Sequence, residues 1–367
     1  MQKSGISVVV LLVVLLAGSL QRLHGTTAAQ NPLKSRSLAA ELQKEGNFAE
    51  ALLLYQLLIE DSENGGDTAA DDLRHGVSCL QQLNRVDELD AFLESAVEIH
   101  PEDWQVLVTT ADLYSSVEHY GFLIGGRFHR GHHRGGGKQV SAQIRDRVRS
   151  LQLLVTAMSL IQKSDDAPPA AKAKLYFQLA NVIGSPRHSQ AWKLQDLTDL
   201  TTLPDYDETA PTHRWRGGFG GSQRGAPVDE NGKPILYALP NSWDTANSDG
   251  ERWRWALNQA AIANPVQQSK VDLLWAGFLQ SQFGVQRQFH VQRAVPRQDD
   301  KRPVEGLTLH ALTDTETLAR LATGDRKLTL PAEFNHISVL QSVIERKDGN
   351  QRQAISQLIQ IRMNRHQ

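Results

Sequence analysis

The sequence predicts a mainly α-helical fold built from helical hairpins, as an extended or two-lobed array with glycine-rich insertions. The first observation is composition: the 367-residue chain is 40% hydrophobic but only 6% aromatic. It is rich in Ala, Leu and Gln, which lose little side-chain entropy in a helix. The second is that apolar residues recur at i, i+3, i+4 and i+7 in several segments. The third is that similar segments follow one another along the chain.

Charge and cysteine content narrow the function classes. The 39 basic and 41 acidic residues leave a formal charge of −2, so the chain as a whole has no electrostatic attraction for nucleic acid or anionic membranes. The single cysteine, Cys79, rules out an internal disulfide and is expected to be a small buried apolar residue.

Residues 1–29 read as a signal peptide. Lys3 precedes the apolar stretch Ile6 to Leu16, which is too short to span a bilayer, and small residues follow at Gly25 to Ala29. We therefore expect an exported protein, periplasmic or secreted, with no membrane span after cleavage. An uncleaved anchor is the alternative.

Residues 30–203 are predicted to form a domain of paired helices. The segment from Leu38 to Glu60 carries small and aromatic residues in the order and spacing of a tetratricopeptide-type hairpin. Ala51 and its counterpart Leu89 are 38 residues apart, which is the usual period of about 34 residues plus a short insertion. Further helices are expected at Trp104 to Tyr114, Ser141 to Gln162, Lys172 to Gly184 and from Ser189 onward.

A linker and a second helical region are expected beyond this domain. Residues 204–247 are polar and rich in glycine and proline, including the turn-forming "DENGKP". Residues 248–367 begin with a capping box, Ser248 and Glu251, and carry a predicted buried face that includes Trp253. In this region we expect a second helix ending near Gly284, a loop at Gln286 to Pro303, and helices from Asp314 and at the carboxyl end. The chain stops inside a helical pattern, which indicates a truncation or longer relatives.

The stretch Gly125 to Lys138 lies within an insertion at residues 121–138 and is rich in His, Arg and Gly. These residue types occur in catalytic and ligand-binding sites, but the stretch fits no catalytic pattern. Its glycine spacing and the Gln after Lys138 do not match a P-loop. His129, His132 and His133 could bind a metal, yet no cysteine or carboxylate lies in the segment. Three alternatives remain: a flexible surface loop, an arginine-glycine element for nucleic acid, and a short local ribbon with the histidines and glycines at its turn. The loop is favoured and no nucleic acid is expected.

Other residues of types that occur in active sites are better explained by structural roles. Ser222 lacks the second glycine of a nucleophile elbow. The pairs Asp71-Asp72 and Asp299-Asp300 fit solvated turns and helix starts, and Trp253 with Trp255 fits a core position plus a contact to the next helix. We therefore assign no catalytic, cofactor-binding or metal-ligating residue, expect no cofactor, and do not expect an enzyme.

Several long phrases resemble one protein family. They include "HYGFLIGGRFHRGHHRGGG", "GAPVDENGKPILYALPNSWDTANSDGERWRWAL" and "DTETLARLATGDRKLTLPAEFN". The resemblance runs from about Gln43 to the end and is to the amino-terminal region of the large exported alpha-2-macroglobulin-like proteins of planctomycete bacteria. It implies a helical leader to β-sandwich macroglobulin domains, a bait region and often a thioester that traps proteases.

The departures from this family limit what the resemblance implies. The thioester pattern Cys-Gly-Glu-Gln is absent and no run of short alternating strands occurs. The expected function is therefore an interaction module without inhibitory machinery, whose protein partner is a macroglobulin domain or a protease. The alternative is a free-standing periplasmic scaffold that binds peptides or proteins.

Overall fold

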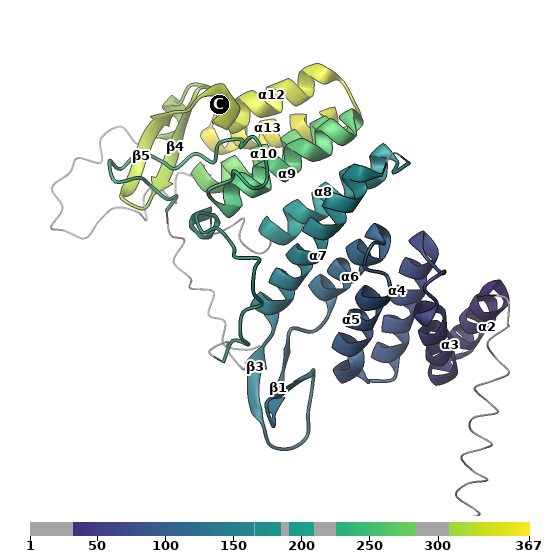
Figure 1. The fold of residues 1–367 in the computed structure, drawn as a ribbon. Helices are drawn as coiled ribbons and strands as arrows, with labels where there is room; N and C mark the ends of the chain where they lie inside the picture. The colour runs from purple at the N-terminus through teal and green to yellow at the C-terminus, as the bar shows by residue number, and fades with distance from the viewer. Residues whose placement is uncertain (1–31, 165, 185–190, 209–224, 284–307) are drawn as a thin grey trace, which may run out of the picture. The chain divides into compact units, whose positions relative to one another are not determined.

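The structure is a computed structural model that describes residues 32–164, 166–184, 191–208, 225–283 and 308–367. Most of these residues are helical, as the composition predicts (Figure 1). The α-helices within the described ranges are α2 (Pro32–Glu45), α3 (Phe48–Glu60), α4 (Gly66–Gln82), α5 (Leu89–Ile99), α6 (Trp104–Ser116), α7 (Gln143–Lys163), α8 (Pro169–Gly184), α9 (Asp249–Ala263), α10 (Gln268–Phe283), α12 (His336–Arg346) and α13 (Gln351–Arg365). None of them is both long enough and apolar enough to cross a membrane.

Two small antiparallel sheets accompany the helices. One has the strand order β2-β1-β3, and the other is the hairpin β4-β5. Their strands are β1 (Tyr120–Ile124), β2 (Arg127–Arg130), β3 (Lys138–Ser141), β4 (Glu316–Leu321) and β5 (Gly324–Thr329). Short 3-10 turns lie at Val86–Glu88, Ala191–Leu194, Pro265–Gln267, Leu309–Ala311 and Ala332–Phe334. The predicted signal peptide and the loop expected at Gln286 to Pro303 lie outside the described residues.

The chain divides into two compact units, Met1–Thr109 and Thr110–Gln367. In the first unit α2 packs on α3, α3 on α4 and α4 on α5. Gly46 joins α2 to α3 at a φ of +87°, a conformation that glycine adopts without strain. Arg36 of α2 donates to the buried carboxylate of Asp72 in α4 at 2.7 Å, with Asn64 hydrogen-bonded to both. This ion pair ties α2 to α4, because breaking it would leave a buried charge without a partner.

In the second unit consecutive helices again pack on one another, α7 on α8, α8 on α9 and α9 on α10. The capping box predicted at Ser248 is confirmed: its hydroxyl accepts from the Glu251 N–H at 3.2 Å, while the Glu251 carboxylate accepts from the Asn247 N–H at 2.7 Å. The buried carboxylate of Asp249 accepts from Arg147 of α7 at 3.0 Å and from the Thr198 N–H at 2.9 Å. One carboxylate thus joins α7, α9 and the segment after α8.

The predicted buried face of α9 is confirmed. Trp253 is 1% exposed and its ring lies 4.9 Å from that of Phe278 in α10. Trp255 is also buried, but it packs edge-on against Tyr176 of the preceding helix α8, not against the next helix as predicted. Both tryptophans are therefore core residues that hold α9 between its two neighbours.

The helix predicted from Ser189 is wrong. The described residues there form a single 3-10 turn, Ala191–Leu194, followed by bends. The Thr198 N–H donates to Asp249, and the Thr198 carbonyl accepts from Arg252 at 2.8 Å. Because α9 side chains take these backbone groups, they are not available for the i to i−4 bonds of a helix.

The helix predicted from Asp314 is also wrong. Residues Glu316–Leu321 form β4, which pairs with β5 across a turn at Gly324, where φ is +116°. The other side of β4 bonds to a residue far away in sequence: the Ala226 N–H donates to the Arg320 carbonyl at 2.7 Å. Pairing of this long range overrides a local apolar pattern that fits a helix as well as a strand.

The sequence interpretation also missed α12. The Asn335 side chain caps α12 by accepting from the Ile337 and Ser338 N–H groups at 2.9 and 3.1 Å. The helix predicted at the carboxyl end is confirmed as α13, which ends at Arg365. His366 adopts a left-handed conformation and its N–H reaches back to the Met363 carbonyl at 3.1 Å.

The stretch Gly125 to Lys138 forms the local ribbon that was one of the three alternatives. β1 pairs with β2 through the turn Gly125-Gly126 and with β3 on its other side. The histidines do not lie at that first turn: His129 is in β2, and His132 and His133 lie in the second connection, before β3. Figure 1 shows this sheet leading into the amino-terminal end of α7.

Candidate functional site

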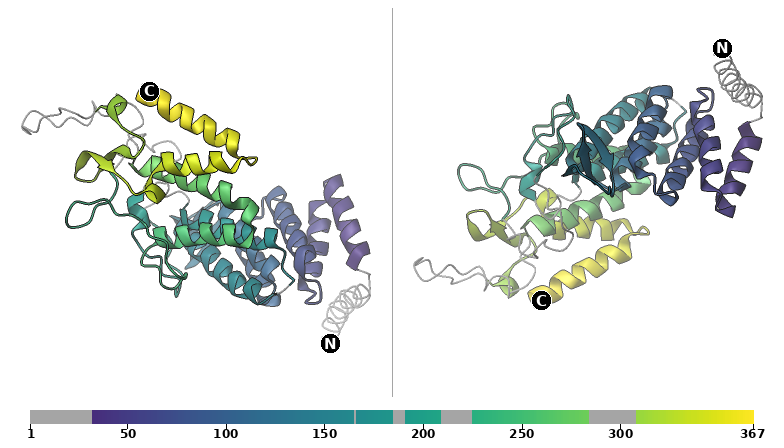
Figure 2. Two further views of the ribbon diagram at one scale, coloured as in Figure 1. Left: turned by 90° about the horizontal axis from the view of Figure 1, so that it is seen from above. Right: turned by 90° about the horizontal axis from the view of Figure 1, so that it is seen from below.

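The helices α10, α12 and α13 share one apolar cluster. Its buried members are Leu273 and Ala276 of α10, Ile337, Leu340 and Val343 of α12, and Ala354 and Ile361 of α13. Figure 2 draws α13 as the outermost helix of this group, running beside α12 towards the marked C-terminus. Within the described part of the chain, the side of α13 that faces away from this cluster is exposed.

α13 exposes a stripe of apolar side chains. Ile355, Ile359 and Met363 are 37%, 53% and 64% exposed, and they follow one another at four-residue intervals. Residues four apart lie on the same face of a helix. We call these three residues the α13 stripe.

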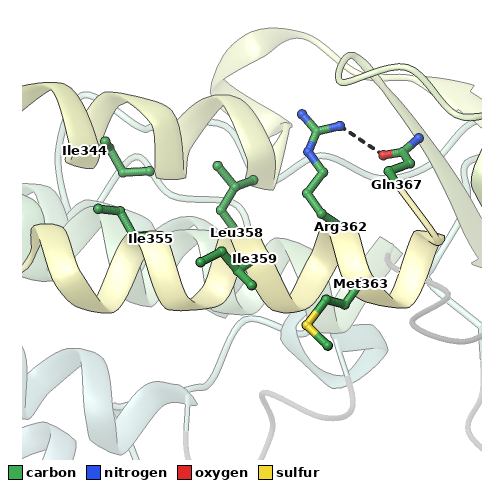
Figure 3. A pocket seen from close by; sticks show the side chains of 7 residues that line it. All are labelled: Ile344, Ile355, Leu358, Ile359, Arg362, Met363 and Gln367. Atoms are coloured by element: carbon green, nitrogen blue, oxygen red, sulfur yellow. Dashed lines mark hydrogen bonds between the residues drawn. The ribbon is translucent and has the colours of Figure 1, made fainter.

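A shallow hollow of 370 Å³ adjoins the α13 stripe (Figure 3). Ile344 of α12 lies on one side of it, and Leu358 and Arg362 point from α13 towards α12, while Met363 points the other way. Arg362 donates to the Gln367 side chain at 2.9 Å and pairs with Asp314 at 2.5 Å. The hollow is therefore mainly apolar, with one guanidinium at its rim whose charge is already balanced.

A second groove, of 560 Å³, lies between α10 and α13. Its lining includes Leu273, Phe278 and Gly277 of α10. Apart from the backbone of its own helix, no described residue lies within 4 Å of where a Cβ of Gly277 would be. From α13 and the turn before it come three amide side chains, those of Asn350, Gln353 and Gln357. The groove thus combines an apolar floor with amide groups along one wall.

The amide wall and one lysine supply the polar chemistry of the groove. The Gln357 Oε1 atom is buried and, among the described residues, accepts no hydrogen bond. A side-chain amide both donates and accepts, as a peptide backbone does. Lys270 of α10 lies at the rim with its ammonium 4.2 Å from the centre of the Phe177 ring.

α13 has no acidic residue, while Arg352, Arg362 and Arg365 are basic. Arg365 points inward, donating to the carbonyls of Thr313 and Glu316 at 3.2 and 3.1 Å, and its burial lowers the pKa of the guanidinium. With Arg362 paired to Asp314, Arg352 is the arginine of this helix that is exposed. The outer surface of α13 therefore presents the α13 stripe among exposed polar residues such as Ser356 and Gln360, with Arg352 as its exposed charge.

The other residues weighed in the sequence occupy structural positions where they are described. Cys79 is fully buried, and burial raises the pKa of its thiol, which makes it a poor nucleophile. Asp71 is exposed and pairs with Arg74, but Asp72 is buried, so its interpretation as a solvated carboxylate is wrong. Ser222 and the pair Asp299-Asp300 lie outside the described residues.

One polar cluster was missed entirely. His119 Nδ1 lies 2.8 Å from Asp146 Oδ2, and Arg130 donates to both oxygens of the same carboxylate at 2.8 and 3.0 Å. Arg130 and Asp146 are buried, so the cluster anchors β2 to α7. No periodicity could reveal it, because Arg130 and Asp146 meet only when the ribbon folds onto the helix. Within the described ranges, no three His, Cys, Asp or Glu side chains are grouped as a metal site would require.

Comparisons with known proteins identify no relative of this chain. The chain matches no family model, and neither curated proteins nor solved structures give a match.

Proposed function

We propose that this chain is an exported helical-repeat interaction module, of the kind that leads an alpha-2-macroglobulin-like protease inhibitor, and that the α13 stripe is its main contact surface. The observation that carries the proposal is the open apolar face of α13, in which Met363 is 64% exposed. The family phrases in the sequence supply the class of partner, a macroglobulin-like β-sandwich domain.

The energetics favour a protein partner for this surface. Fully burying an aliphatic side chain stabilises a complex by about 1.5–3 kcal/mol. Covering three half-exposed side chains and the hollow beside them therefore contributes several kcal/mol, which is enough for a measurable contact if the ordering costs are small. Apolar stripes of this kind on helices are how helices dock with one another and with sheets.

The test is a binding titration of the full chain with purified macroglobulin-like domains, followed by biolayer interferometry. The double variant Ile359→Gln/Met363→Gln should weaken binding about tenfold or more, since each change removes about 1 kcal/mol of apolar burial. The matched control is Ile262→Gln on α9, which alters an apolar residue that is 63% exposed but lies elsewhere. Equal weakening by the control, or no binding by the unchanged chain, would refute the proposal.

A second candidate function is a free-standing peptide-binding scaffold, and the groove between α10 and α13 favours it. An extended peptide needs hydrogen-bond partners for its backbone, and Asn350, Gln353 and Gln357 can supply them along one wall. The apolar floor suits one buried side chain, and Lys270 suits a carboxylate of the peptide.

Gly277 offers a clean test of the peptide-binding candidate. Gly277→Leu should fill the groove and abolish binding of a fluorescent peptide library, whereas Gly277→Ala should leave it intact. Both variants should raise the stability of α10 by roughly 0.5–1 kcal/mol, because glycine is a poor helix former. A library that binds Gly277→Leu as well as the unchanged chain would exclude this groove as the site.

A further inference from the structure

The basic surface of the β2-β1-β3 sheet has no role in the function proposed above. Residues 119–145 contain five Arg or Lys and four His but no Asp or Glu. In a chain with a formal charge of −2, this is a strong local concentration of positive charge. The folded structure determines which of these charges is available for a ligand.

On the inward face of the sheet, the charged side chain is paired with a carboxylate and the aromatic side chain is packed against another ring. Arg130 is buried against Asp146, and Phe128 stacks on Tyr206 with ring centres 4.4 Å apart. Arg145 of α7 lies over the same Tyr206 ring and donates to the Pro204 carbonyl at 2.9 Å. These groups hold the sheet to the rest of the unit and are not free to bind a ligand.

The outward face carries flat rings beneath a loop. Successive strand residues alternate between faces, so Phe122 and its cross-strand partner His129 point away from Phe128. His133, from the loop between β2 and β3, lies 6.0 Å from both the Phe122 and the His129 rings. The loop can lie this close because a Cβ at Gly137 would be only 2.9 Å from Ile124.

The unpaired positive charge of this ribbon comes from β2 and from the loop between β2 and β3. Arg127 and Arg134 are exposed, and neither has a carboxylate partner within the described part of the chain. At the opposite edge Lys138 is paired with Glu208, so its charge is balanced. β2 is also the outer strand of the sheet, so a ligand can approach it from the side.

We propose that Arg127, Arg134 and the imidazoles of His129 and His132 bind an anionic polysaccharide, one that carries sulfate or carboxylate groups. Exposed arginines of one short ribbon, in a segment without acidic residues, attract polyanions of this type. Single-stranded nucleic acid fits less well, because it requires exposed aromatic faces on which bases stack, and Phe122 is half-buried with the His133 ring tilted against it. The proposal is independent of the α13 stripe, which lies on a different element.

The experiment measures binding of the full chain to dextran sulfate, with neutral dextran and oligo-dT as comparison ligands. We expect dextran sulfate to bind most tightly, and its affinity to fall about tenfold between about 50 and about 200 mM salt, as for the release of counterions by two contacts. Arg127→Gln/Arg134→Gln should weaken binding about tenfold or more, as removal of both contacts requires. The control, Lys174→Gln/Arg352→Gln, removes two exposed charges elsewhere and should change it less than about twofold.

A second measurement does not depend on any variant. Dextran sulfate should protect Arg127 and Arg134 of the unchanged chain from modification by phenylglyoxal, read out by mass spectrometry, while Arg352 stays reactive. Equal weakening by the control variant, equal protection of all arginines, or no binding to dextran sulfate would overturn the proposal. Tighter binding of oligo-dT than of dextran sulfate would overturn it in favour of nucleic acid.

Discussion

Helices α9 and α13 are both 15 residues long, yet they use their apolar residues in opposite ways. α9 buries both of its tryptophans between α8 and α10. α13 buries Ala354 and Ile361 but leaves the α13 stripe exposed. Apolar content alone therefore does not determine burial, because α9, packed between two helices, buries more of its apolar side chains than α13, although Ile262 of α9 is also exposed.

The substitution expected to cost the most stability lies in α9. Trp253→Ala should lower the free energy of unfolding by about 3–5 kcal/mol, because it empties a core site between α9 and α10. Urea denaturation followed by far-ultraviolet circular dichroism measures it. A loss below about 1 kcal/mol, the range of partly exposed sites, would show that Trp253 is not a core residue.

The next largest loss of stability is expected on acidification, through His336 at the start of α12. Burial, with help from the charge of Arg365, lowers the pKa of His336 to about 4. The unfolded chain therefore binds a proton from about pH 6.5 downward while the folded chain does not, so the folded state should lose about 3 kcal/mol between pH 6.5 and pH 4. Denaturation curves across this range measure the loss.

The control for this titration is His336→Gln, which carries no titratable group at the same place. This variant should lose less stability than the unchanged protein as the pH falls through the same window. The same slope in both proteins would assign the acid sensitivity to other groups.

Removing the N-cap side chain should cost more free energy of unfolding in α9 than in α13, by a smaller amount than the effects above. Ser248→Ala at the start of α9 should cost about 1 kcal/mol, because the hydroxyl accepts from the Glu251 N–H. Asn350 at the start of α13 makes no side-chain capping bond, so Asn350→Ala should cost only about 0.5 kcal/mol or less. Thermal unfolding of the two variants side by side gives the comparison, and equal losses would contradict it.

The smallest effect is expected at the α13 stripe itself. Ile359→Gln/Met363→Gln should change the free energy of unfolding by no more than about 0.5 kcal/mol per site, as for other exposed positions. A loss of several kcal/mol would mean that these side chains stabilise the fold and are not an open contact surface.

Local signals in the sequence predicted much of the helical structure. The capping box at Ser248 and the buried face around Trp253 were readable because both depend on neighbours within one or two turns of the helix. The failures have a common cause. β4 and the segment around Thr198 are fixed by partners far away in sequence, Ala226 for the first and Asp249 for the second.

The candidate surfaces were not predicted, although two of their signals were present. The four-residue spacing of Ile355, Ile359 and Met363 predicts an apolar face, but only the packing of α10 and α12 decides that this face stays open. Likewise the absence of acids from residues 119–145 is visible in the sequence, whereas the neutralisation of Arg130 by Asp146 is not. Asn335, a residue type that caps helices, is also a sequence signal for the start of α12.

The most direct test of the α13 stripe as a protein contact is photo-crosslinking from the intact chain. A benzophenone amino acid placed at Ile359 should form an adduct with a macroglobulin-like domain, and one placed at Ile262 should not. Adducts of equal yield from both positions, or none from Ile359 while the domain binds, would contradict the assignment of this surface.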